Sequence, residues 1–516
     1  MEPTTKDGDP KRRLARTKIV ATLGPKSWDA ATIAGMIEAG ASAFRFNFSH
    51  VTKPEQYQGI AAAIQRVREA SVHAGRAIAV LQDLGGPKIR TGSLQGNVPV
   101  TLKVGEHVKI THKEPESRDG VISTTYEKLV HDVKVGDRIL LDDGHLELVC
   151  VDSTWDSLVC RVISGGQLWS NKGINLPGVT VSAPAFTEKD RHDLDFGLEQ
   201  NIDFVALSFV RSATDVRSLR DYIRSRGKEV AIVAKIEKQE AVDDLENILD
   251  AAEGIMVARG DLGVEVPSER LPVLQKTIIS KARERGRVVI TATQMLESMT
   301  QNPRPTRAET SDVANAIFDG TDAVMLSGET ANGAYPVQTV ATMHAIADYT
   351  ESSSLYEREM SQLPPDHGGD IADATVHAAC TAARDLGAAA IMSFTSSGRT
   401  CFKISFSRPK TRMIGATFTE RAYNRLALCW GMESLLMPEA RSVDELYFLA
   451  EKCLLENHLA KPRDLVVLVT GSNIGSGGTN TIKIHKVGKP DIIANSELVQ
   501  KFYELYRRLG YDPERM

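Results

Sequence analysis

The sequence predicts an α/β protein: a TIM (β/α)8 barrel with an inserted small β-barrel lid domain and a C-terminal open α/β domain. Three observations support this prediction. Short apolar runs rich in β-branched residues, typical of parallel strands buried on both faces, alternate with helical segments. Eight such runs precede residue 330, and eight βα units close a TIM barrel. The alternation stops once, for about one hundred residues of antiparallel pattern.

Three predicted barrel strands precede the interruption and five follow it. They are, in chain order, Thr17–Leu23, Ala43–Ser49, Ile78–Asp83, Phe204–Phe209, Val230–Lys235, Gly254–Ala258, Val288–Thr293 and Ala323–Ser327. Helices are expected over residues 29–40 and 54–73. Thr306 and Glu309 have the spacing of a capping box, which predicts the start of a later helix.

The interruption itself has the pattern of β-hairpins. Short alternating runs cover 98–102, 138–142 and 145–151, and Asp142-Asp-Gly144 between the last two predicts a tight turn. Because this segment follows the carboxyl end of the third strand, we expect a separate lid that closes over a site there.

A segment with Pro364-Pro365 predicts a linker over 351–369. After it, a helix over 371–386 and four strands predict a doubly wound unit. Those strands are 389–394, 413–418, 433–437 and 465–470, and an amphipathic helix without assigned function starts near 495. The expected parts are an N-terminal segment 1–16, the barrel 17–84 with 185–352, the lid 85–184, an effector domain 370–488 and a tail 489–516.

Bulk properties exclude several classes of function. The net charge of −5 argues against general binding to nucleic acid or a membrane. Six separated cysteines without C-x-x-C spacing indicate free thiols in a reducing compartment. No apolar run is as long as a membrane span, and no signal-type apolar region follows the basic stretch 11–16. These observations predict a cytoplasmic protein.

Charged residues end two neighbouring barrel strands. Lys235 and Glu237 follow one strand, and Arg259 and Asp261 follow the next. Charged strand ends are often plain loop residues, but two in successive units, with glycines for close backbone approach, favour chemistry. Two carboxylates with a lysine suit a divalent metal that holds an anionic substrate. Five cations at the strand ends form a basic cluster that suits phosphate-bearing substrates and phosphoryl transfer, namely Arg45, Lys88, Arg90, Lys235 and Arg259. Neither a Walker A motif nor G-x-G-x-x-G is present.

Seven ordered motifs, spread between about residue 17 and residue 487, resemble pyruvate kinase. They are Phe44–His50, Asp83–Arg90, Lys172–Gly178, Val233–Glu237, Met256–Gly263, Thr291–Ser298 and Met325–Thr330. The resemblance implies transfer of a phosphoryl group from phosphoenolpyruvate to ADP, giving pyruvate and ATP. It also implies a homotetramer.

The resemblance assigns roles by matching position. Glu237 and Asp261 would hold Mg²⁺ or Mn²⁺, Lys235 would neutralise the migrating phosphoryl group and the enolate, and Arg45 would grip the phosphoryl group. Thr293 would lie near the carbon that is protonated, with a water relay as donor because a threonine hydroxyl is a poor acid. The substrate site would also include Ser327 and the backbone amides of Arg259, Gly260 and Asp261. Nucleotide contacts would come from Asn47, His50, Arg90 and Lys172.

One departure from the family pattern concerns K⁺. Many relatives bind K⁺ through positions matching Asn47, Ser49, Asp83 and the Leu84 carbonyl, and carry Glu where this chain has Lys88. The Lys88 ammonium could supply the same charge, so we expect no requirement for K⁺. The alternative is that Lys88 is a solvated loop residue.

The last domain carries a candidate phosphate site directly after a strand. Hydroxyls, a glycine and an arginine precede a helix there: Thr395, Ser396, Ser397, Gly398, Arg399 and Thr400. The resemblance makes this an allosteric effector pocket. The companion loop 471–478 has no basic residue, which favours a monophosphorylated sugar or a nucleotide over a bisphosphate. The alternative is an empty loop in an unregulated enzyme.

Two rival functions remain at the level of sequence. A barrel aldolase that uses a metal-bound pyruvate enolate would explain neither the inserted lid nor the nucleotide-side residues. A catalytically silent metabolite sensor would be expected to have lost Lys235, Glu237, Asp261 or Thr293, and the chain has all four.

Overall fold

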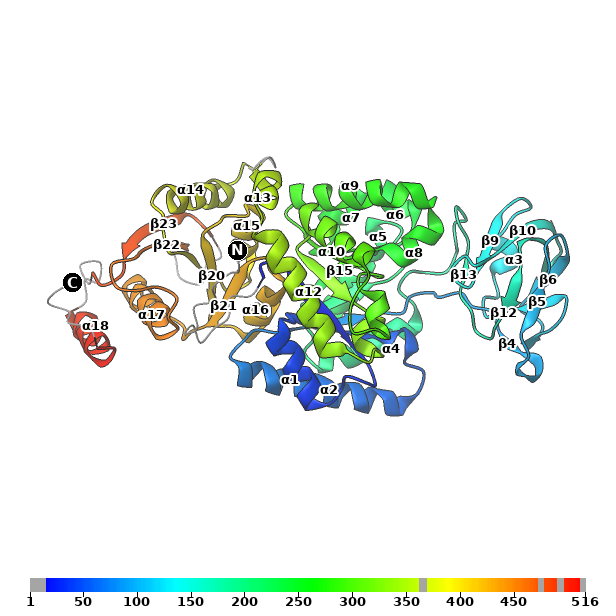
Figure 1. Ribbon diagram of the computed structural model, residues 1–516, viewed down its shortest axis with the longest axis horizontal. Coiled ribbons are helices and arrows are strands. Elements are labelled where there is room, and N and C mark those ends of the chain that lie inside the picture. The colour runs from blue at the N-terminus through cyan, green and yellow to red at the C-terminus, as the bar shows by residue number, and fades with distance from the viewer. Residues whose placement is uncertain (1–14, 362–368, 472–477, 490–495, 511–516) are drawn as a thin grey trace.

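The computed structural model describes residues 15–361, 369–471, 478–489 and 496–510. The chain forms three bodies in a row (Figure 1). The barrel lies in the middle, the inserted β domain extends from one end of it, and the C-terminal domain sits against the other end.

The central body is a closed barrel of parallel strands, as predicted. Its strand order is β1-β18-β17-β16-β15-β14-β3-β2, and β1 pairs with both β2 and β18. The strands are β1 Lys18–Leu23, β2 Ala43–Asn47, β3 Ala79–Asp83, β14 Phe204–Leu207, β15 Ala231–Ile236, β16 Gly254–Ala258, β17 Val288–Ala292 and β18 Ala323–Leu326. Strands β14 and β17 end before their predicted boundary because Phe209 and Thr293 have φ of 55° and 68°, which takes the chain out of the ladder.

Helices surround the barrel and begin at caps that the sequence supplies. Asp29 accepts a hydrogen bond from the Thr32 amide, and Thr306 forms the predicted capping box with Glu309. The helices are α1 Ala30–Ala39, α2 Pro54–Ala74, α4 Glu188–Glu199, α5 Ala213–Ser225, α6 Gln239–Asp243, α7 Leu245–Ala251, α8 Arg259–Glu265, α9 Leu271–Glu284, α10 Arg307–Phe318, α11 Gly328–Ala331 and α12 Pro336–Glu351, with short 3-10 turns η1 Phe48–His50, η3 Ser268–Arg270 and η4 Glu297–Thr300.

The inserted domain has a six-stranded sheet, β13-β9-β10-β11-β6-β8, two two-stranded sheets and an apolar core of its own. Asp142, Asp143 and Gly144 all have positive φ and form the predicted turn between β9 and β10. The elements are β4 Ser93–Leu94, η2 Gln95–Asn97, β5 Val100–Leu102, β6 His107–Thr111, β7 Glu116–Ser117, β8 Val121–Ser123, α3 Leu129–Asp132, β9 Arg138–Leu141, β10 Leu146–Ser153, β11 Ser157–Ser164, β12 Gly166–Leu168 and β13 Ile174–Asn175.

The C-terminal domain is an open sheet in the order β21-β20-β19-β22-β23. The four predicted strands are parallel, and β23, which the sequence analysis missed, pairs antiparallel at the edge. The predicted linker also contains a helix, α13. The elements are α13 Ser354–Ser361, α14 Ile371–Asp385, β19 Ala390–Phe394, α15 Arg399–Phe406, β20 Arg412–Thr417, α16 Glu420–Arg425, η5 Leu426–Leu428, β21 Met432–Leu436, α17 Val443–Glu456, β22 Leu465–Thr470, β23 Thr481–Lys486 and α18 Ser496–Arg508.

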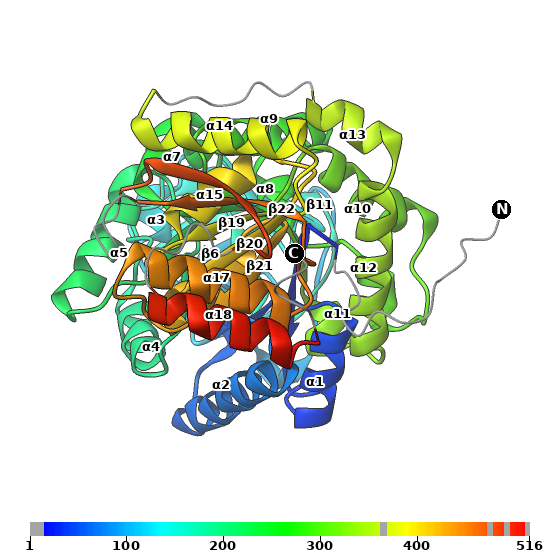
Figure 2. The same cartoon turned by 90° about the vertical axis from the view of Figure 1, so that its left-hand side faces the viewer.

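The predicted amphipathic helix of the tail, α18, lies beside α17 and belongs to this domain (Figure 2). Phe502 and Tyr506 are buried in its core. The Tyr506 hydroxyl donates to Glu451, whose other carboxylate oxygen is 2.5 Å from His485 Nε2. None of the helices in the described ranges is long and apolar enough to cross a membrane.

A buried ion pair joins the C-terminal domain to the amino-terminal end of the barrel. Arg408 Nη2 is 2.7 Å from Asp322 Oδ1, and both side chains are almost fully buried. The Arg408 guanidinium also stacks over Trp430, 4.1 Å from the ring centre. The lid and the C-terminal domain therefore occupy opposite ends of the barrel (Figure 1).

Candidate active site

Lys235 is at the centre of a buried charge cluster at the carboxyl end of the barrel. Its Nζ is 2.8 Å from Glu237 Oε1 and 3.4 Å from Asp83 Oδ1, and it donates a 2.8 Å hydrogen bond to Ser208 Oγ. Burial alone would lower the pKa of Lys235, but the two carboxylates outweigh it and raise that pKa above its ordinary value. The ammonium is therefore permanently charged.

Arg45, on β2, lies against the other oxygen of the same carboxylate. Its Nε and Nη2 are 2.7 Å and 2.6 Å from Asp83 Oδ2, and Nη1 donates to Thr22 Oγ1 at 3.1 Å. Burial opposes ionisation of Asp83, yet Lys235 and Arg45 hold its pKa below the ordinary value. One carboxylate thus positions both cations that the sequence predicts at the phosphoryl group.

Glu237 and Asp261 have the chemistry of a divalent metal site. Glu237 is buried, and its Oε2 accepts a 2.7 Å hydrogen bond from the Phe209 amide. Its buried Oε1 contacts Lys235 Nζ at 2.8 Å and has no further polar partner in the described structure. Burial raises the pKa of Glu237, opposed by Lys235 and reinforced by the nearby charge of Asp261.

A hard cation would satisfy the remaining lone pairs of this oxygen and would neutralise the two adjacent carboxylates. The described residues contain no group of three or more His, Cys, Asp or Glu side chains that could hold a metal. Two carboxylates alone would leave positions on such a cation for oxygens of substrate or water.

Thr293 follows β17 in a strained conformation. A β-branched residue rarely adopts the left-handed region, and such outliers gather at functional sites. Its Oγ1 accepts a 2.8 Å hydrogen bond from the Gly260 amide and lies 2.6 Å from the Ala292 carbonyl. The hydroxyl is thereby held against the first turn of α8, which carries Asp261.

Arg259 corrects one expectation. The sequence analysis counts its guanidinium among the cations open to a phosphate, but the structure places it beneath the Thr293 loop. Nη1 is 2.7 Å from Asp312, and Nη2 donates to the Thr293 carbonyl at 2.6 Å. The side chain anchors the loop, because its donors are already in use. This correction concerns the guanidinium alone, because the group expected to bind the substrate carboxylate is the backbone amide of Arg259.

The predicted nucleotide side is also basic. Burial lowers the pKa of His50 first, followed by the charges of Lys88, Arg90 and Arg45, which places these cations around the imidazole. Arg90 Nη1 donates to the Asn171 carbonyl at 3.0 Å. Lys88 and Asp261 line one narrow cavity of about 40 Å³ between barrel and lid.

The other predicted site residues have these positions. Lys172 pairs with Asp142 inside the lid at 2.8 Å. The Ser327 amide donates to Glu329 Oε2 at 2.6 Å, at the end of β18. Asn47 Oδ1 accepts from the Ser49 amide at 3.1 Å, which makes it the cap of η1.

The positions that match a K⁺ site lie close together. The Leu84 carbonyl accepts a 2.8 Å hydrogen bond from Ser208 Oγ. A Cβ added to Gly85 would be 3.3 Å from Ser49 Cα, so glycine permits this close approach. Asp83 faces Arg45 and Lys235, as described above.

Sequence reasoning missed two supporting residues of the charge cluster. Thr22 accepts from Arg45, and Ser208 contacts Lys235, Asp83 and the Leu84 carbonyl. Both are small polar residues at the carboxyl ends of apolar barrel strands. The signal that singled out the charged residues would have found them if hydroxyls had been included.

The predicted effector loop borders a cavity of about 610 Å³ in the C-terminal domain. Its lining includes Thr395, Ser396, Ser397, Arg399 and Thr400, together with Gly471 after β22. Gly398 has φ of 91° and donates its amide to Thr395 Oγ1 at 2.8 Å. The strand order reverses between β19 and β22, and ligands of open α/β sheets bind at such a switch point. Most of the companion loop, residues 472–477, is outside the described residues.

These features define a class of protein. A parallel barrel with a lysine, an arginine and two carboxylates converging at its carboxyl end, and with a separate inserted domain at that end, is a barrel enzyme built for metal-assisted phosphoryl transfer.

Comparison with known proteins names the family. The family model of the pyruvate kinase barrel domain matches residues 14–340, and that of the pyruvate kinase alpha/beta domain matches residues 373–485. The chain belongs to the pyruvate kinase family. This membership agrees with the resemblance found in the sequence and does not support the aldolase alternative.

Individual relatives cover almost the whole chain. A pyruvate kinase of Geobacillus stearothermophilus is 45% identical over 486 residues, 93% of this chain and 82% of the relative. One of Mycobacterium intracellulare is 45% identical over 482 residues, 92% of this chain and 99% of the relative. A crystal structure of a pyruvate kinase from Cryptosporidium parvum superposes with a TM-score of 0.84 at 36% identity, over 92% of this chain and 96% of that one.

Proposed function

We propose that this chain moves the phosphoryl group of phosphoenolpyruvate to ADP through the Lys235 cluster. The bond from the enol oxygen to phosphorus breaks, a bond from a β-phosphate oxygen of ADP forms, and the enolate takes a proton at its methylene carbon to give pyruvate. The observation that carries this proposal is the convergence of Lys235 and Arg45 on the two oxygens of Asp83, beside Glu237.

In this proposal the two cations neutralise charge that develops in the transition state. Lys235 faces the bridging oxygen and the enolate, and Arg45 faces the phosphoryl oxygens. Because Asp83, Thr22 and Ser208 already hold both side chains, little reorganisation accompanies the transfer. Mg²⁺ or Mn²⁺ held by Glu237 and Asp261 would supply a Lewis acid for the carboxylate and phosphate of the substrate. The amides at the start of α8 would orient that carboxylate.

Thr293 would position the water that protonates the enolate. Its hydroxyl accepts from Gly260 and contacts the Ala292 carbonyl, which directs its hydrogen toward a backbone acceptor. A hydroxyl held in this way is suited to orienting a water molecule, whereas its own pKa makes it a poor proton donor. Ser327, at the end of β18, would be a further residue of the phosphoenolpyruvate site.

The cations around His50 would receive the nucleotide. Arg90, His50 and Asn47 would approach ADP from the barrel and Lys172 from the lid. We also propose that K⁺ is not required. Lys88 lines the same narrow cavity as Asp261, so its ammonium can supply charge near the stacked phosphates. The Leu84 carbonyl already accepts a hydrogen bond from Ser208.

The cavity at the switch point of the C-terminal sheet would bind an allosteric effector. A monophosphorylated sugar or a nucleotide fits best, because its phosphate would use the hydroxyls and Arg399. By analogy with the family we propose a homotetramer. Cytoplasmic location is proposed from the cysteines, all six of which are free and four of which are buried.

A coupled assay for pyruvate tests the central proposal. Phosphoenolpyruvate, ADP and Mg²⁺ would be supplied first with KCl and then with Tris chloride alone. ADP-dependent pyruvate at equal rates supports both the transfer and the independence from K⁺. Activity with KCl alone would keep the transfer and discard the role of Lys88. No ADP-dependent pyruvate in either buffer would overturn the proposed function.

A further inference from the structure

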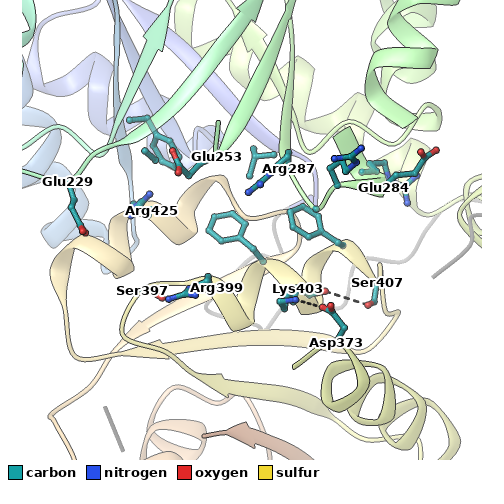
Figure 3. A pocket seen from close by; sticks show the side chains of 18 of the residues that line it. Glu229, Glu253, Glu284, Arg287, Asp373, Ser397, Arg399, Lys403, Ser407 and Arg425 are labelled. Atoms are coloured by element: carbon teal, nitrogen blue, oxygen red, sulfur yellow. Dashed lines mark hydrogen bonds and ion pairs between the residues drawn. The ribbon is translucent and has the colours of Figure 1, made fainter. Parts of the chain in front are cut away.

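A second cavity lies where the C-terminal domain meets the amino-terminal end of the barrel. Its volume is about 590 Å³. Barrel residues just before β15, β16 and β17 form one wall, and helices α15 and α16 form the other (Figure 3). The lid and the Lys235 cluster are at the opposite end of the barrel, so this space is separate from the proposed active site (Figure 1).

The cavity is rich in cations although the whole chain is acidic. Seven Arg or Lys side chains and four Asp or Glu side chains line it, while the chain has a net charge of −5. Three of the four carboxylates are already neutralised. Asp373 pairs with Lys403, Glu229 with Arg421 at 2.5 Å, and Glu253 with Arg220 at 2.9 Å. Glu284 accepts a hydrogen bond from Ser280.

Four of the lining guanidinium groups remain without such partners. The side chains of Arg283, Arg287, Arg399 and Arg425 form no hydrogen bond or ion pair with any residue in the described part of the chain. Figure 3 places Arg287 on the barrel side of the space and Arg399 and Arg425 on the side of the C-terminal domain. Arg287 Nε is buried, and burial lowers the pKa of Arg425, so neither charge is fully solvated. Partly desolvated guanidinium groups that form no direct ion pair are an anion-binding arrangement.

The shape and lining limit the anion to a small organic molecule. A volume of this size accepts a ligand of metabolite size. Phe402 and Phe406 also line it, with ring centres 6.3 Å apart, and offer apolar surface beside the cations. A guanidinium group can form a bidentate contact, with two parallel hydrogen bonds, to the oxygens of one phosphate. A phosphate monoester with an organic body therefore matches both parts of the lining.

We propose that the cavity between barrel and C-terminal domain is a binding site for a phosphate monoester, with the phosphate held by Arg287 and Arg425. The site is distinct from the effector cavity but adjoins it, because Ser397, Arg399 and Lys403 line both. A ligand in either cavity engages the same first turn of α15, so the two sites are coupled through Arg399. Binding here is independent of the phosphoryl transfer proposed above.

Titration calorimetry on the full chain tests this site. The probes are AMP, ribose 5-phosphate and the uncharged control adenosine, without phosphoenolpyruvate, ADP or metal. Arg287→Gln and Arg425→Gln each remove one unpaired cation, and neither residue lines the effector cavity. Arg285→Gln is the matched control, because Arg285 lines the same cavity but already pairs with Glu246 at 2.8 Å and Asp250 at 2.6 Å. Thr400→Val alters the effector cavity alone.

We expect at least one of the two phosphate esters to bind and adenosine not to bind. Arg287→Gln and Arg425→Gln should each raise the dissociation constant about tenfold, the effect of losing one charge-assisted hydrogen bond. Arg285→Gln and Thr400→Val should change it less than about twofold. Comparison of AMP with ribose 5-phosphate shows whether the ligand is a nucleotide or a sugar phosphate.

Three results would overturn the proposal. One is that neither ester binds the wild-type chain. Another is that binding is lost in Thr400→Val but unchanged in Arg287→Gln, which would place the ligand in the effector cavity. The third is an equal loss in Arg285→Gln and Arg287→Gln, which would indicate a diffuse positive field. Thermal unfolding of each variant reports folding, and the pyruvate assay on the same preparations reports the proposed function separately.

Discussion

The cations of the Lys235 cluster differ in their pairing from several cations at the opposite end of the barrel. At the carboxyl end, Lys235 and Arg45 both contact the Asp83 carboxylate, and Glu237 adds a second partner. At the amino-terminal end, Arg287 faces a cavity without a carboxylate partner among the described residues. Lys18, the first residue of β1, is buried there, and its Nζ donates to the Met432 carbonyl at 2.9 Å.

This difference separates two uses of positive charge. Paired cations are held in position before substrate arrives, so they stabilise a transition state with little reorganisation. Removal of one leaves a buried carboxylate uncompensated. Unpaired cations are available to a ligand and raise the energy of the empty protein. We therefore expect substitutions at paired cations to be damaging and substitutions at unpaired cations to be mild or even stabilising.

The largest effect should come from Lys235→Met. Loss of the ammonium removes charge stabilisation from the transition state and leaves Asp83 and Glu237 facing each other. We expect kcat/KM for phosphoenolpyruvate to fall by about a thousandfold, the upper range for one electrostatic contact. Lys281→Met, at a half-exposed pair with Glu246, is the control and should retain activity. A loss below tenfold would contradict the central role of Lys235.

Arg408→Met tests a paired cation at the amino-terminal end. Because its partner Asp322 is buried, the substitution should lower the free energy of unfolding by about 3–5 kcal/mol. Arg412→Met removes an ion pair of the same 2.7 Å length with the half-exposed Glu433 and should cost less than about 1 kcal/mol. Urea denaturation compares the two. Equal losses would show that burial of the pair does not decide its contribution.

Lys18 should make stability depend on pH. Burial lowers its pKa from 10.5 to about 8, despite opposing attraction from Cys429 and Glu433. Between those two pH values the unfolded chain binds the proton and the folded chain does not, so the free energy of unfolding rises with pH. Relative to Lys18→Met, the wild type should gain about 3 kcal/mol between pH 7 and pH 10. Denaturation curves at several pH values measure it, and a parallel pH dependence of the two proteins would refute the shift.

Lys88→Glu should have the smallest effect. It tests an unpaired cation at the carboxyl end of the barrel, beside the paired Lys235 and Arg45. Lys88 forms no ion pair there within the described ranges. We expect the variant to lose about tenfold in kcat in Tris chloride, since one phosphate-facing charge is reversed, and to recover with KCl. The assay described above measures both. A variant that is equally active in the two salts would show that Lys88 is only a solvated loop residue.

The order of elements was predictable because local patterns encode it. The eight buried strand runs, the capping box at Thr306 and the turn at Asp142 are each written in a few neighbouring residues, and the structure contains all of them. The strand that was not predicted also lacks a clear local pattern. Strand β23 pairs antiparallel at a sheet edge, where only one of its six residues, His485, is buried, and it lacks a continuous apolar run.

The candidate site was predictable to the level of residue positions but not of side-chain directions. Strand ends indicated Lys235, Glu237 and Asp261, since all carboxyl ends of a parallel barrel meet on one face. That rule also selected Arg259, whose guanidinium turns beneath the Thr293 loop to Asp312. Direction depends on partners distant in the chain, and Asp312 is more than fifty residues away.

The sequence by itself determined the barrel, the inserted lid, the C-terminal sheet and the set of charged residues at the strand ends. Periodicity and turn chemistry act over a few residues, and the ordered motifs specify the family. Tertiary structure alone decided which charges are compensated. Asp83 pairs with Arg45 and Lys235, while Arg287 and Arg425 line one cavity at a domain boundary without ion-pair partners among the described residues. Pairing depends on distances of a few ångströms between groups that lie tens to more than a hundred residues apart in the chain, and burial then sets the strength of each electrostatic interaction.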